Sequence, residues 1–432
     1  MRKTVSFTIS DVTNFKKLLL QWAQQYHEVV WLDSNQHKDI YSSFDGLLAV
    51  DALTSLVTDS ENAFAKLKEY QNSTKDWVFG YVSYDVKNDV ENLSSVNYDG
   101  LGFPDLNFFQ PKKIIRLTGN KVDFIYLNMV DDESEEDYKA ITGGVVLENT
   151  SIQPNPIKIK LRIFKDEYFR RLGKMLAYIH KGAIYEANFC QEFYAEDTQI
   201  NPFDVYKKLN EISHPPYATF LRLDDKYLLS ASPERYIKKT GTKIISQPIK
   251  GTAKRALDKK EDALLIQRLE NDEKERAENI MIVDLVRNDL SKSAVKGTVE
   301  VSELCKVYTF DQVHQMISTV IAKVPVDKNP VEIIKETFPM GSMTGAPKVS
   351  AMNIIEELEA TKRGLYSGAV GYFTPENNFD FSVVIRSILY NETEKYVSFS
   401  VGSAITAKAS PEKEYEECLL KAKAMREVLE CN

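Results

Sequence analysis

The amino-acid sequence predicts a globular α+β protein with a large, substantially antiparallel sheet and helices around it. Segments with helical periodicity alternate with short strand-like runs along the chain. Of the 432 residues, 43% are hydrophobic and 11% aromatic, which is enough to bury a large core in one big domain or two ordinary ones. The sequence contains no internal repeat, coiled-coil heptad or low-complexity tract.

The predicted elements follow one another with the periods that distinguish helices from strands. Helical patterns occupy four segments in the second part of the chain: 165–179, 262–290, 349–358 and 412–429. Strand-like runs rich in β-branched and aromatic residues occupy six segments: 29–32, 77–82, 217–223, 227–232, 381–389 and 396–401.

A connection between two parts of the chain is predicted before residue 157. The chain is mostly acidic at 131–137, and the glycine pair 143–144 and the segment 154–156 are rich in residues that break regular structure. We therefore divide the chain into an N-terminal α+β part, 1–157, and a catalytic part, 158–432, in which the dense motifs fall.

The composition excludes several classes of protein. A net charge of −8 argues against nucleic-acid and membrane-surface partners. The four cysteines are scattered and have no metal-ligand spacing, which fits a reducing, cytoplasmic compartment. The N-terminus lacks the apolar stretch of a signal peptide, and no run approaches the ~18 apolar residues of a membrane span. We therefore expect cytoplasmic small-molecule chemistry.

A carboxylate and an amine could meet in one cavity near the middle of the chain. Glu234 lies in Ser-Pro-Glu-Arg, and Lys250 follows in Pro-Ile-Lys-Gly-Thr. Flanked by Ile249 and Gly251, the lysine is expected to be partly desolvated, which lowers its pKa and frees its amine as a nucleophile. In the same cavity Glu234 could stay protonated and act as a general acid. The alternative is an ordinary salt bridge at a strand end.

Two pairs of glutamates at helical spacing could close on one metal ion. Glu275 and Glu278 share one helix face, and Glu414 and Glu417 share another, with Lys421 one turn further on. Oxygen ligands without a neighbouring cysteine or histidine suit Mg²⁺, whose coordination water and an anionic substrate complete. The alternative for Glu417 and Lys421 is an ion pair in solvent.

Three further features could bind an anion. The glycine-containing loop 339–348 runs into a helix with Pro347 in its first turn, where backbone amides bind carboxylates or phosphates. It lacks Walker A spacing, and a plain tight turn is the alternative. Arg386 at a strand end needs an anionic partner, either a protein or a substrate carboxylate. His314 lies among apolar residues, where a satisfied core histidine is the commoner case.

Taken in order, these segments resemble the chorismate-binding enzyme family, which includes the large subunits of anthranilate and aminodeoxychorismate synthases and, as relatives, isochorismate and salicylate synthases. The resemblance covers roughly residues 160–427 and rests on six motifs: SPER, PIKGT, RAENIMIVDLVRNDL, GSMTGAPK, YSGAVG leading to IRS, and PEKEYEE. It implies a large mixed or antiparallel β-sandwich flanked by helices. Lys250 resembles the aminodeoxychorismate synthases, since anthranilate synthases typically carry a small residue there.

The resemblance also implies a reaction, Mg²⁺-dependent amination of chorismate at C4 to 4-amino-4-deoxychorismate, the entry to p-aminobenzoate and folate. Glu234 would be the general acid for the leaving 4-hydroxyl, and Lys250 would add to C2 before ammonia enters at C4. Four glutamates are implied at the metal: Glu278 and Glu417, with Glu275 and Glu414 nearby. Ten residues are implied as substrate contacts: Gly251, Thr252, His314, Thr344, Gly345, Tyr366, Arg386, Gly402, Ala404 and Lys421.

Three positions depart from the family pattern. The common Tyr-Gln-x-Asn motif reads Tyr-Glu-Ala-Asn here, so that Glu186 stands in place of glutamine near C2 or the ammonia route. The usual Gly-x-Gly turn is Gly-Ser-Ala at 402–404, which retains main-chain contacts only if no glycine-only conformation is needed there. Lys408 stands where the family has an aspartate.

The partner and the rival functions follow from what the motifs contain. No cysteine sits in a nucleophile elbow with a histidine partner, so the resemblance implies ammonia from a separate glutaminase subunit resembling aminodeoxychorismate synthase component II.

Anthranilate synthase component I is the nearest rival, disfavoured by Lys250. A water-using isochorismate or salicylate synthase is disfavoured because 182–186 lacks a lysine to activate water. A silent regulatory subunit is disfavoured by Glu234, Glu278 and Glu417 occurring together with Lys250.

Overall fold

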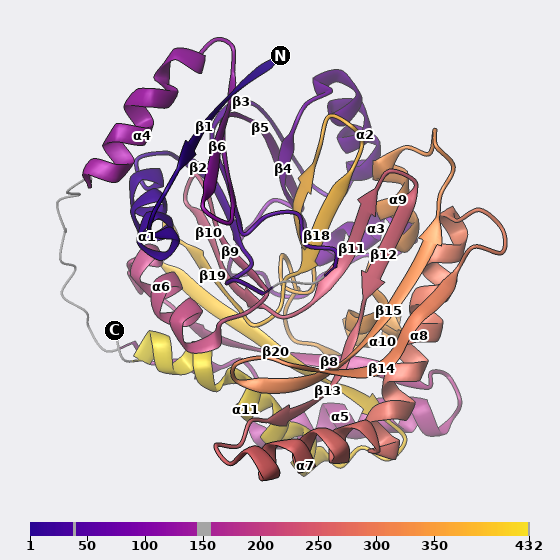
Figure 1. The fold of residues 1–432 in the computed structure, drawn as a ribbon. Helices are drawn as coiled ribbons and strands as arrows, with labels where there is room; N and C mark the ends of the chain where they lie inside the picture. The colour runs from indigo at the N-terminus through magenta and orange to yellow at the C-terminus, as the bar shows by residue number, and fades with distance from the viewer. Residues whose placement is uncertain (38–39, 145–156, 431–432) are drawn as a thin grey trace.

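The fold is α+β, with a large antiparallel sheet and helices around it, as the sequence predicts (Figure 1). The computed structural model describes residues 1–37, 40–144 and 157–430. Within this part every pair of named strands is antiparallel. The one parallel contact in the described ranges is an isolated bridge between Tyr98 and Thr361.

The strands form two arms that share the long strands β3 and β5. The first arm runs in the order β1 (Arg2–Thr8), β6 (Lys121–Leu127), β5 (Leu106–Thr118), β3 (Gly46–Thr58), β2 (Glu28–Asp33), β9 (Tyr217–Leu223), β10 (Lys226–Ser232), β19 (Ser387–Asn391), β20 (Tyr396–Thr406) and β8 (Glu186–Ala195), with β7 (Lys160–Leu161) and β16 (Gly345–Ala346) on β8. The second continues from β5 through β4 (Val78–Val82), β17 (Ala369–Phe373), β18 (Phe379–Val383), β11 (Arg235–Thr240), β12 (Lys243–Gln247) and β15 (Val313–Lys323), with β13 (Ile249–Lys254) and β14 (Glu300–Thr309) on β15.

The helices lie around these arms (Figure 1). In chain order they are α1 (Val12–Ala23), α2 (Ala63–Thr74), α3 (Lys87–Val90), α4 (Ser134–Gly143), α5 (Lys165–His180), α6 (Pro202–Ser213), α7 (Lys259–Glu270), α8 (Glu273–Ser293), α9 (Pro330–Thr337), α10 (Lys348–Leu358) and α11 (Pro411–Glu430), with short 3₁₀ turns at Tyr84–Val86, Asp131–Glu133 and Gly341–Met343.

Two apolar cores lie on opposite faces of the first arm. On β2, Val29 and Trp31 pack into a core shared with α1, α5, α6, α10 and α11. Val30 points the other way, into a core that contains strands of both arms together with α2, α8 and α9. Burial on both faces explains why such strands read as continuous apolar runs, because alternating side chains all meet apolar neighbours.

Strands from the two sides of residue 157 pair with one another. In β2, Trp31 lies opposite Phe220 of β9, and in β4, Gly80 lies opposite Gly371 of β17. The division of the chain at 157 stays a prediction, and the sheet joins the two parts. The segment 154–156, part of the predicted connection, lies outside the described residues.

The predicted acidic connection at 131–137 is wrong, because this segment is a 3₁₀ turn that leads into α4. Glu133 and Asp137 lie 2.5 and 2.6 Å from the Lys113 ammonium, and acidic side chains are stabilised at a helix N-terminus. The run of acids thus serves as a helix start rather than as a solvated linker.

Two predicted elements are divided in the structure. The helix predicted at 262–290 is two helices, α7 and α8, because the Asp272 side chain accepts a hydrogen bond from the Glu275 amide and starts a new helix. The strand predicted at 381–389 is interrupted between β18 and β19, where Arg386 has a left-handed backbone with φ of +53°. This interruption turns Arg386 towards the cavity described below.

Candidate functional site

Lys250 on β13 lies among carboxylates from four other segments of the chain. Its ammonium is 3.5 Å from Glu186 Oε1 at the start of β8. Burial lowers the pKa of Lys250, but the charges of Glu186, Glu278, Glu234 and Glu417 outweigh burial and raise it overall. The expectation that desolvation lowers this pKa is therefore wrong, because the sequence does not reveal how many carboxylates gather around the amine.

Glu234 is a buried acid with a strongly perturbed pKa. It lies between β10 and β11, and its carbonyl accepts a hydrogen bond of 3.0 Å from the Val383 amide of β18. Burial raises the pKa of Glu234 to about 7, with the nearby Lys250 charge opposing the rise. Glu234 and Lys250 form no ion pair among the described residues. The alternative of an ordinary salt bridge between these two residues is therefore wrong. A carboxyl with this pKa is protonated in a large share of the molecules at neutral pH, which suits general acid chemistry.

The first two turns of α8 and of α11 carry the glutamates predicted to bind a metal. Burial raises the pKa of Glu278 to about 7, and it also raises those of Glu275 and Glu414. Within the described ranges, no three or more His, Cys, Asp or Glu side chains form a group that could hold a metal ion. The prediction that Glu278 and Glu417 hold Mg²⁺, with Glu275 and Glu414 nearby, stays a prediction.

Lys421 connects α11 to β20. It also forms the ion pair with Glu417 that the sequence analysis gave as an alternative to a metal site. Its ammonium is 2.6 Å from Glu417 Oε1 and donates a hydrogen bond of 2.8 Å to the Gly402 carbonyl. Burial acts to raise the pKa of Glu417, but the adjacent Lys421 lowers it overall, so this carboxyl stays ionised. The pair keeps an anionic oxygen beside the Lys250 cluster.

A cavity of about 220 Å³ is lined by Thr252, Arg386 and Lys421. In the part of the chain that the structure describes, no side chain forms a hydrogen bond or ion pair with the Arg386 guanidinium. Burial lowers the pKa of Arg386, with Tyr366 and Glu417 opposing. An unpaired guanidinium at a cavity wall is a binding group for a carboxylate ligand, because its fork of donors matches two carboxylate oxygens.

The loop before α10 is packed against the first residues of β8. The Asn188 amide donates to the Thr344 carbonyl at 2.8 Å, and the Tyr185 amide donates to the Ala346 carbonyl at 2.7 Å. A Cβ on Gly345 would lie 2.2 Å from the Glu186 carbonyl oxygen, so only glycine permits this approach. The glycine thus serves the contact between loop and strand, which also fixes the backbone of Glu186.

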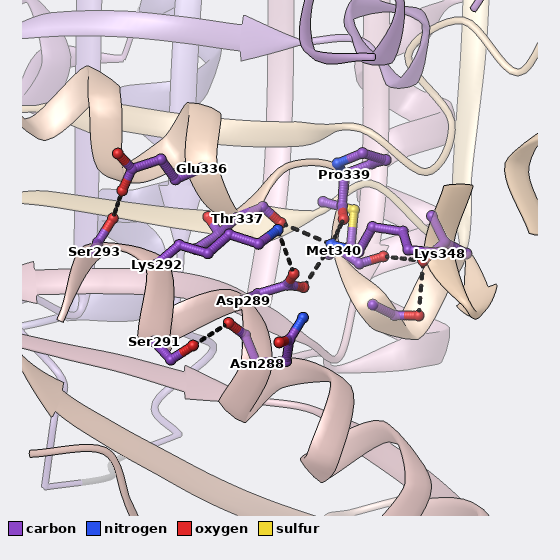
Figure 2. A network of polar contacts seen from close by, with 12 residues as sticks. Asn288, Asp289, Ser291, Lys292, Ser293, Glu336, Thr337, Pro339, Met340 and Lys348 are labelled. Atoms are coloured by element: carbon purple, nitrogen blue, oxygen red, sulfur yellow. Dashed lines mark hydrogen bonds and ion pairs between the residues drawn. The ribbon is translucent and has the colours of Figure 1, made fainter. Parts of the chain in front are cut away.

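Lys348 closes this loop and fastens it to α8, as Figure 2 shows. The Lys348 ammonium lies 2.5 Å from Asp289 Oδ2 and 2.8 Å from the Pro339 carbonyl, to which it donates a hydrogen bond. Lys292 pairs with the other oxygen of Asp289 at 3.2 Å. The lysine at the end of the GAPK motif therefore has a structural role, holding the loop to α8.

A buried ion pair behind the site was not anticipated from the sequence. The Arg363 guanidinium binds both oxygens of Glu359 at 2.7 and 2.9 Å and donates to the carbonyls of Met343 and Asn188. Breaking a buried pair of this kind is strongly destabilising because it strands a charge. The i, i+4 spacing of the two residues was the available signal, although the same spacing is common on exposed helix faces.

His314 is placed as a satisfied core histidine rather than as a substrate contact. It is fully buried, with Nδ1 3.0 Å from Thr309 Oγ1 and Nε2 2.9 Å from Asp262 Oδ1. Both ring nitrogens are therefore occupied by protein partners. The sequence analysis gave a satisfied core histidine as the commoner case. The structure favours it because α7 places Asp262 beside His314 of β15.

Other predicted contacts lie around the same region. Tyr366 is buried, with its hydroxyl 3.6 Å from Cys190 Sγ. Gly251 has φ of +93°, which favours glycine. Residues 402–404 lie within β20 and none has a positive φ, so the departure to Gly-Ser-Ala needs no glycine-only conformation. Lys408 is exposed in the turn after β20.

A larger cavity of about 560 Å³ lies elsewhere, between the start of the chain and the second arm. Its wall includes Leu32, Asp33 and Ser34 together with Arg235 and Asp380. None of the predicted site residues lines this larger cavity, whereas the predicted substrate contacts Thr252, Arg386 and Lys421 line the smaller one.

The charge of Glu417 acts both on Lys250, which lies beside the buried acid Glu234, and on the Arg386 guanidinium at the cavity wall. This set of groups suits a small anionic substrate. The sequence pattern of the family described as chorismate binding enzyme matches residues 23–427. This chain belongs to the chorismate-binding enzyme family, and it is a chorismate-converting enzyme of the group that contains anthranilate and aminodeoxychorismate synthases.

Relatives of both kinds match the chain. It is 32% identical to anthranilate synthase component 1 of Acetivibrio thermocellus, over 81% of this chain and 74% of that protein. It is 39% identical to aminodeoxychorismate synthase component 1 of Klebsiella aerogenes, over 62% of this chain and 58% of that protein. Anthranilate synthase component I of Streptococcus pneumoniae has the same fold, with a TM-score of 0.76 at 25% identity over 90% of this chain and 94% of that one.

The chain spans less than two thirds of the length of four aminodeoxychorismate synthases that it matches, with coverage of 37% to 58%. Among the helices of the described residues, none combines the length and the apolar character needed to cross a bilayer.

Proposed function

We propose that this protein aminates chorismate at C4 with ammonia to give 4-amino-4-deoxychorismate, the precursor of p-aminobenzoate in folate synthesis. One observation carries the proposal. Lys250 and the buried acid Glu234 lie close enough that the charge of each shifts the pKa of the other. By resemblance, a lysine at position 250 is typical of aminodeoxychorismate synthases. The Arg386 guanidinium, which forms no hydrogen bond or ion pair among the described residues, is suited to a chorismate carboxylate.

The residues of the site divide the reaction between them. Arg386 and Thr252 hold the substrate, and the neutral amine of Lys250 forms a bond to C2 of the ring. The electron pairs of the ring diene shift towards C4, and the C4 hydroxyl leaves as water with the proton of Glu234. Ammonia then bonds to C4 while the bond between Lys250 and C2 breaks, and Glu234 takes up a proton from the new ammonium group.

The donor set fits Mg²⁺. Glu278 and Glu417 come from two helices that both face Lys250, and Mg²⁺ is commonly held by one or two carboxylates plus substrate and water. Burial raises the pKa of Glu278 to about 7, and a cation bound beside this carboxylate would offset the cost of its buried charge. When bound, the ion neutralises a substrate carboxylate and orients the ring. Glu275 and Glu414 are proposed to support the two ligands from the same helix faces.

Replacing one of these ligands is expected to weaken metal binding rather than the fold. In E278Q the magnesium concentration for half-maximal rate should rise more than tenfold, since one of two carboxylate ligands is lost. Isothermal titration of Mg²⁺ in the presence of chorismate measures the same loss without turnover. The control is D284Q, which removes an exposed acid on the same helix α8. Equal magnesium dependence in E278Q and wild type would exclude Glu278 as a ligand.

Ammonia is proposed to come from a separate glutaminase subunit. Four of the matched relatives are named as component 1 of their synthases, which fits a two-component enzyme. Free ammonium at alkaline pH is expected to support a slower reaction without the partner. This arrangement makes the amination testable with the isolated chain.

The decisive measurement is mass spectrometry of the product from purified protein, chorismate, Mg²⁺ and ammonium. We expect aminodeoxychorismate, and none of it without Mg²⁺. The second candidate is anthranilate synthase component I, favoured by the 32% identical relative and by the fold match. Anthranilate as product would replace the proposal with this candidate. Unchanged chorismate, even with a glutaminase added, would indicate a silent regulatory subunit.

A further inference from the structure

Glu186 is the carboxylate nearest to Lys250. One of its two carboxylate oxygens has no hydrogen-bond partner among the described residues. Its Oε1 atom lies 3.5 Å from the Lys250 ammonium, closer than any other carboxylate of the described residues. Its Oε2 atom is buried without a hydrogen-bond partner in the described part of the chain, and the residue is only 2% exposed. Burying an unpaired carboxylate oxygen is costly, so such an atom in a site points to a function.

The backbone around Glu186 holds this side chain in place. Glu186 begins β8, where it pairs with Thr406 of β20 on one side and with Ala346 of β16 on the other. Gly345 lies so close to the Glu186 carbonyl that a side chain there would clash. With both edges of the strand bonded, the carboxylate is directed at Lys250 by rigid structure rather than by a mobile loop.

The other carboxylates near Lys250 already have roles. Glu234 is the acid for the leaving hydroxyl, and Glu278 and Glu417 are the proposed metal ligands. None of these three forms an ion pair with the lysine among the described residues, whereas Glu186 does. A lysine surrounded by negative charge stays an ammonium, which has no free electron pair, and it needs a base before it can add to carbon.

We propose that Glu186 is a further catalytic residue, the base that accepts a proton from the Lys250 ammonium as this lysine adds to chorismate. This inference rests on the proposed function, in which Lys250 is the nucleophile. It also gives a role to the position at which this chain has glutamate instead of the family's glutamine, since an amide cannot accept this proton.

The proton balance of the cycle closes within the site. The Lys250 ammonium gives one proton to Glu186, and the resulting amine forms its bond to C2 while the C4–O bond breaks. When ammonia bonds to C4, the N–C2 bond breaks and Lys250 leaves as a neutral amine. It then takes its proton back from Glu186, so that both residues return to their starting state.

The test follows the covalent step by itself. Full-length protein is mixed with chorismate and Mg²⁺ without ammonia, and intact-protein mass spectrometry follows the increase by chorismate less water. At pH 7 we expect E186Q to form this adduct roughly 100-fold more slowly than wild type, a usual contribution of one acid or base. The ratio of the E186Q rate to the wild-type rate at the same pH should approach one as the pH is raised, because solvent hydroxide then removes the lysine proton in both proteins.

The charged groups around this proton are known. Lys250 on β13 and Glu278 on α8 face Glu186, and Glu234 and Glu417 lie beyond the lysine. The matched control is E196Q, which removes an exposed carboxylate just after the same strand β8 and should leave the rate unchanged. E186D, which keeps a carboxylate but withdraws it, should retain an intermediate rate. Thermal unfolding and magnesium-dependent chorismate binding confirm that each variant is folded.

Three outcomes distinguish the role of Glu186 as the base from the proposed function, in which Lys250 is the nucleophile. Slow adduct formation in E186Q at pH 7, with a ratio to the wild-type rate that approaches one at high pH, supports Glu186 as the base. Equal adduct rates in E186Q and wild type overturn the role of Glu186 and leave Lys250 as the nucleophile. No adduct in wild type, together with none in K250A, overturns the proposed function and the role of Glu186 with it.

Discussion

Replacing Lys250 by alanine is expected to lower aminodeoxychorismate formation by on the order of 10⁴-fold or more, the largest effect of any single substitution in the chain. The amine is the proposed nucleophile, and removing a nucleophile leaves only binding and electrostatic effects at a site. The shortened side chain also removes the cation that four carboxylates surround. Product mass spectrometry and the intact-protein adduct assay both measure this loss.

The matched control for this substitution lies on the same strand. K254A removes an exposed lysine of β13 and should leave product formation within a few-fold of wild type. Retention of aminodeoxychorismate in K250A at near wild-type rate would rule out covalent catalysis by this lysine. A switch to anthranilate in K250A would instead show that the lysine selects the product.

Replacing Glu234 by glutamine is expected to slow the reaction by about 10² to 10⁴-fold, because an amide of the same shape cannot protonate the leaving hydroxyl. Burial raises the pKa of Glu234 to about 7, so the acid form is present below this pH and is lost as the pH rises through it. The single-turnover rate of wild type should therefore fall above pH 7 from this group.

The pH profile of E234Q distinguishes a chemical role from a structural one. The variant should lose the decline near pH 7 and retain the contribution of the remaining groups, including Lys250. A decline of the same size at the same pH in E234Q would assign it to another residue, such as Glu278, whose pKa is also about 7. Chorismate affinity should change little, since Arg386 provides the anion contact.

Much of the local structure could be predicted from the sequence. The strand predicted at 217–223 is β9, and the helix predicted at 349–358 differs from α10 by one residue at its start. Such elements are set by apolar periodicity over neighbouring residues, which a single chain displays directly. The predictions that failed involve local polar signals with more than one outcome, such as the acids at 131–137 and Asp272, which start helices.

The sequence by itself determined the fold class, the order of the motifs and the family, because these depend on residue patterns along the chain. Only the tertiary structure decided the state of the site. The pKa of Lys250 rises instead of falling because Glu186, Glu234, Glu278 and Glu417 converge on it from distant segments. Electrostatic interaction falls off with distance in space rather than along the chain, so these contacts carry no signature in sequence spacing.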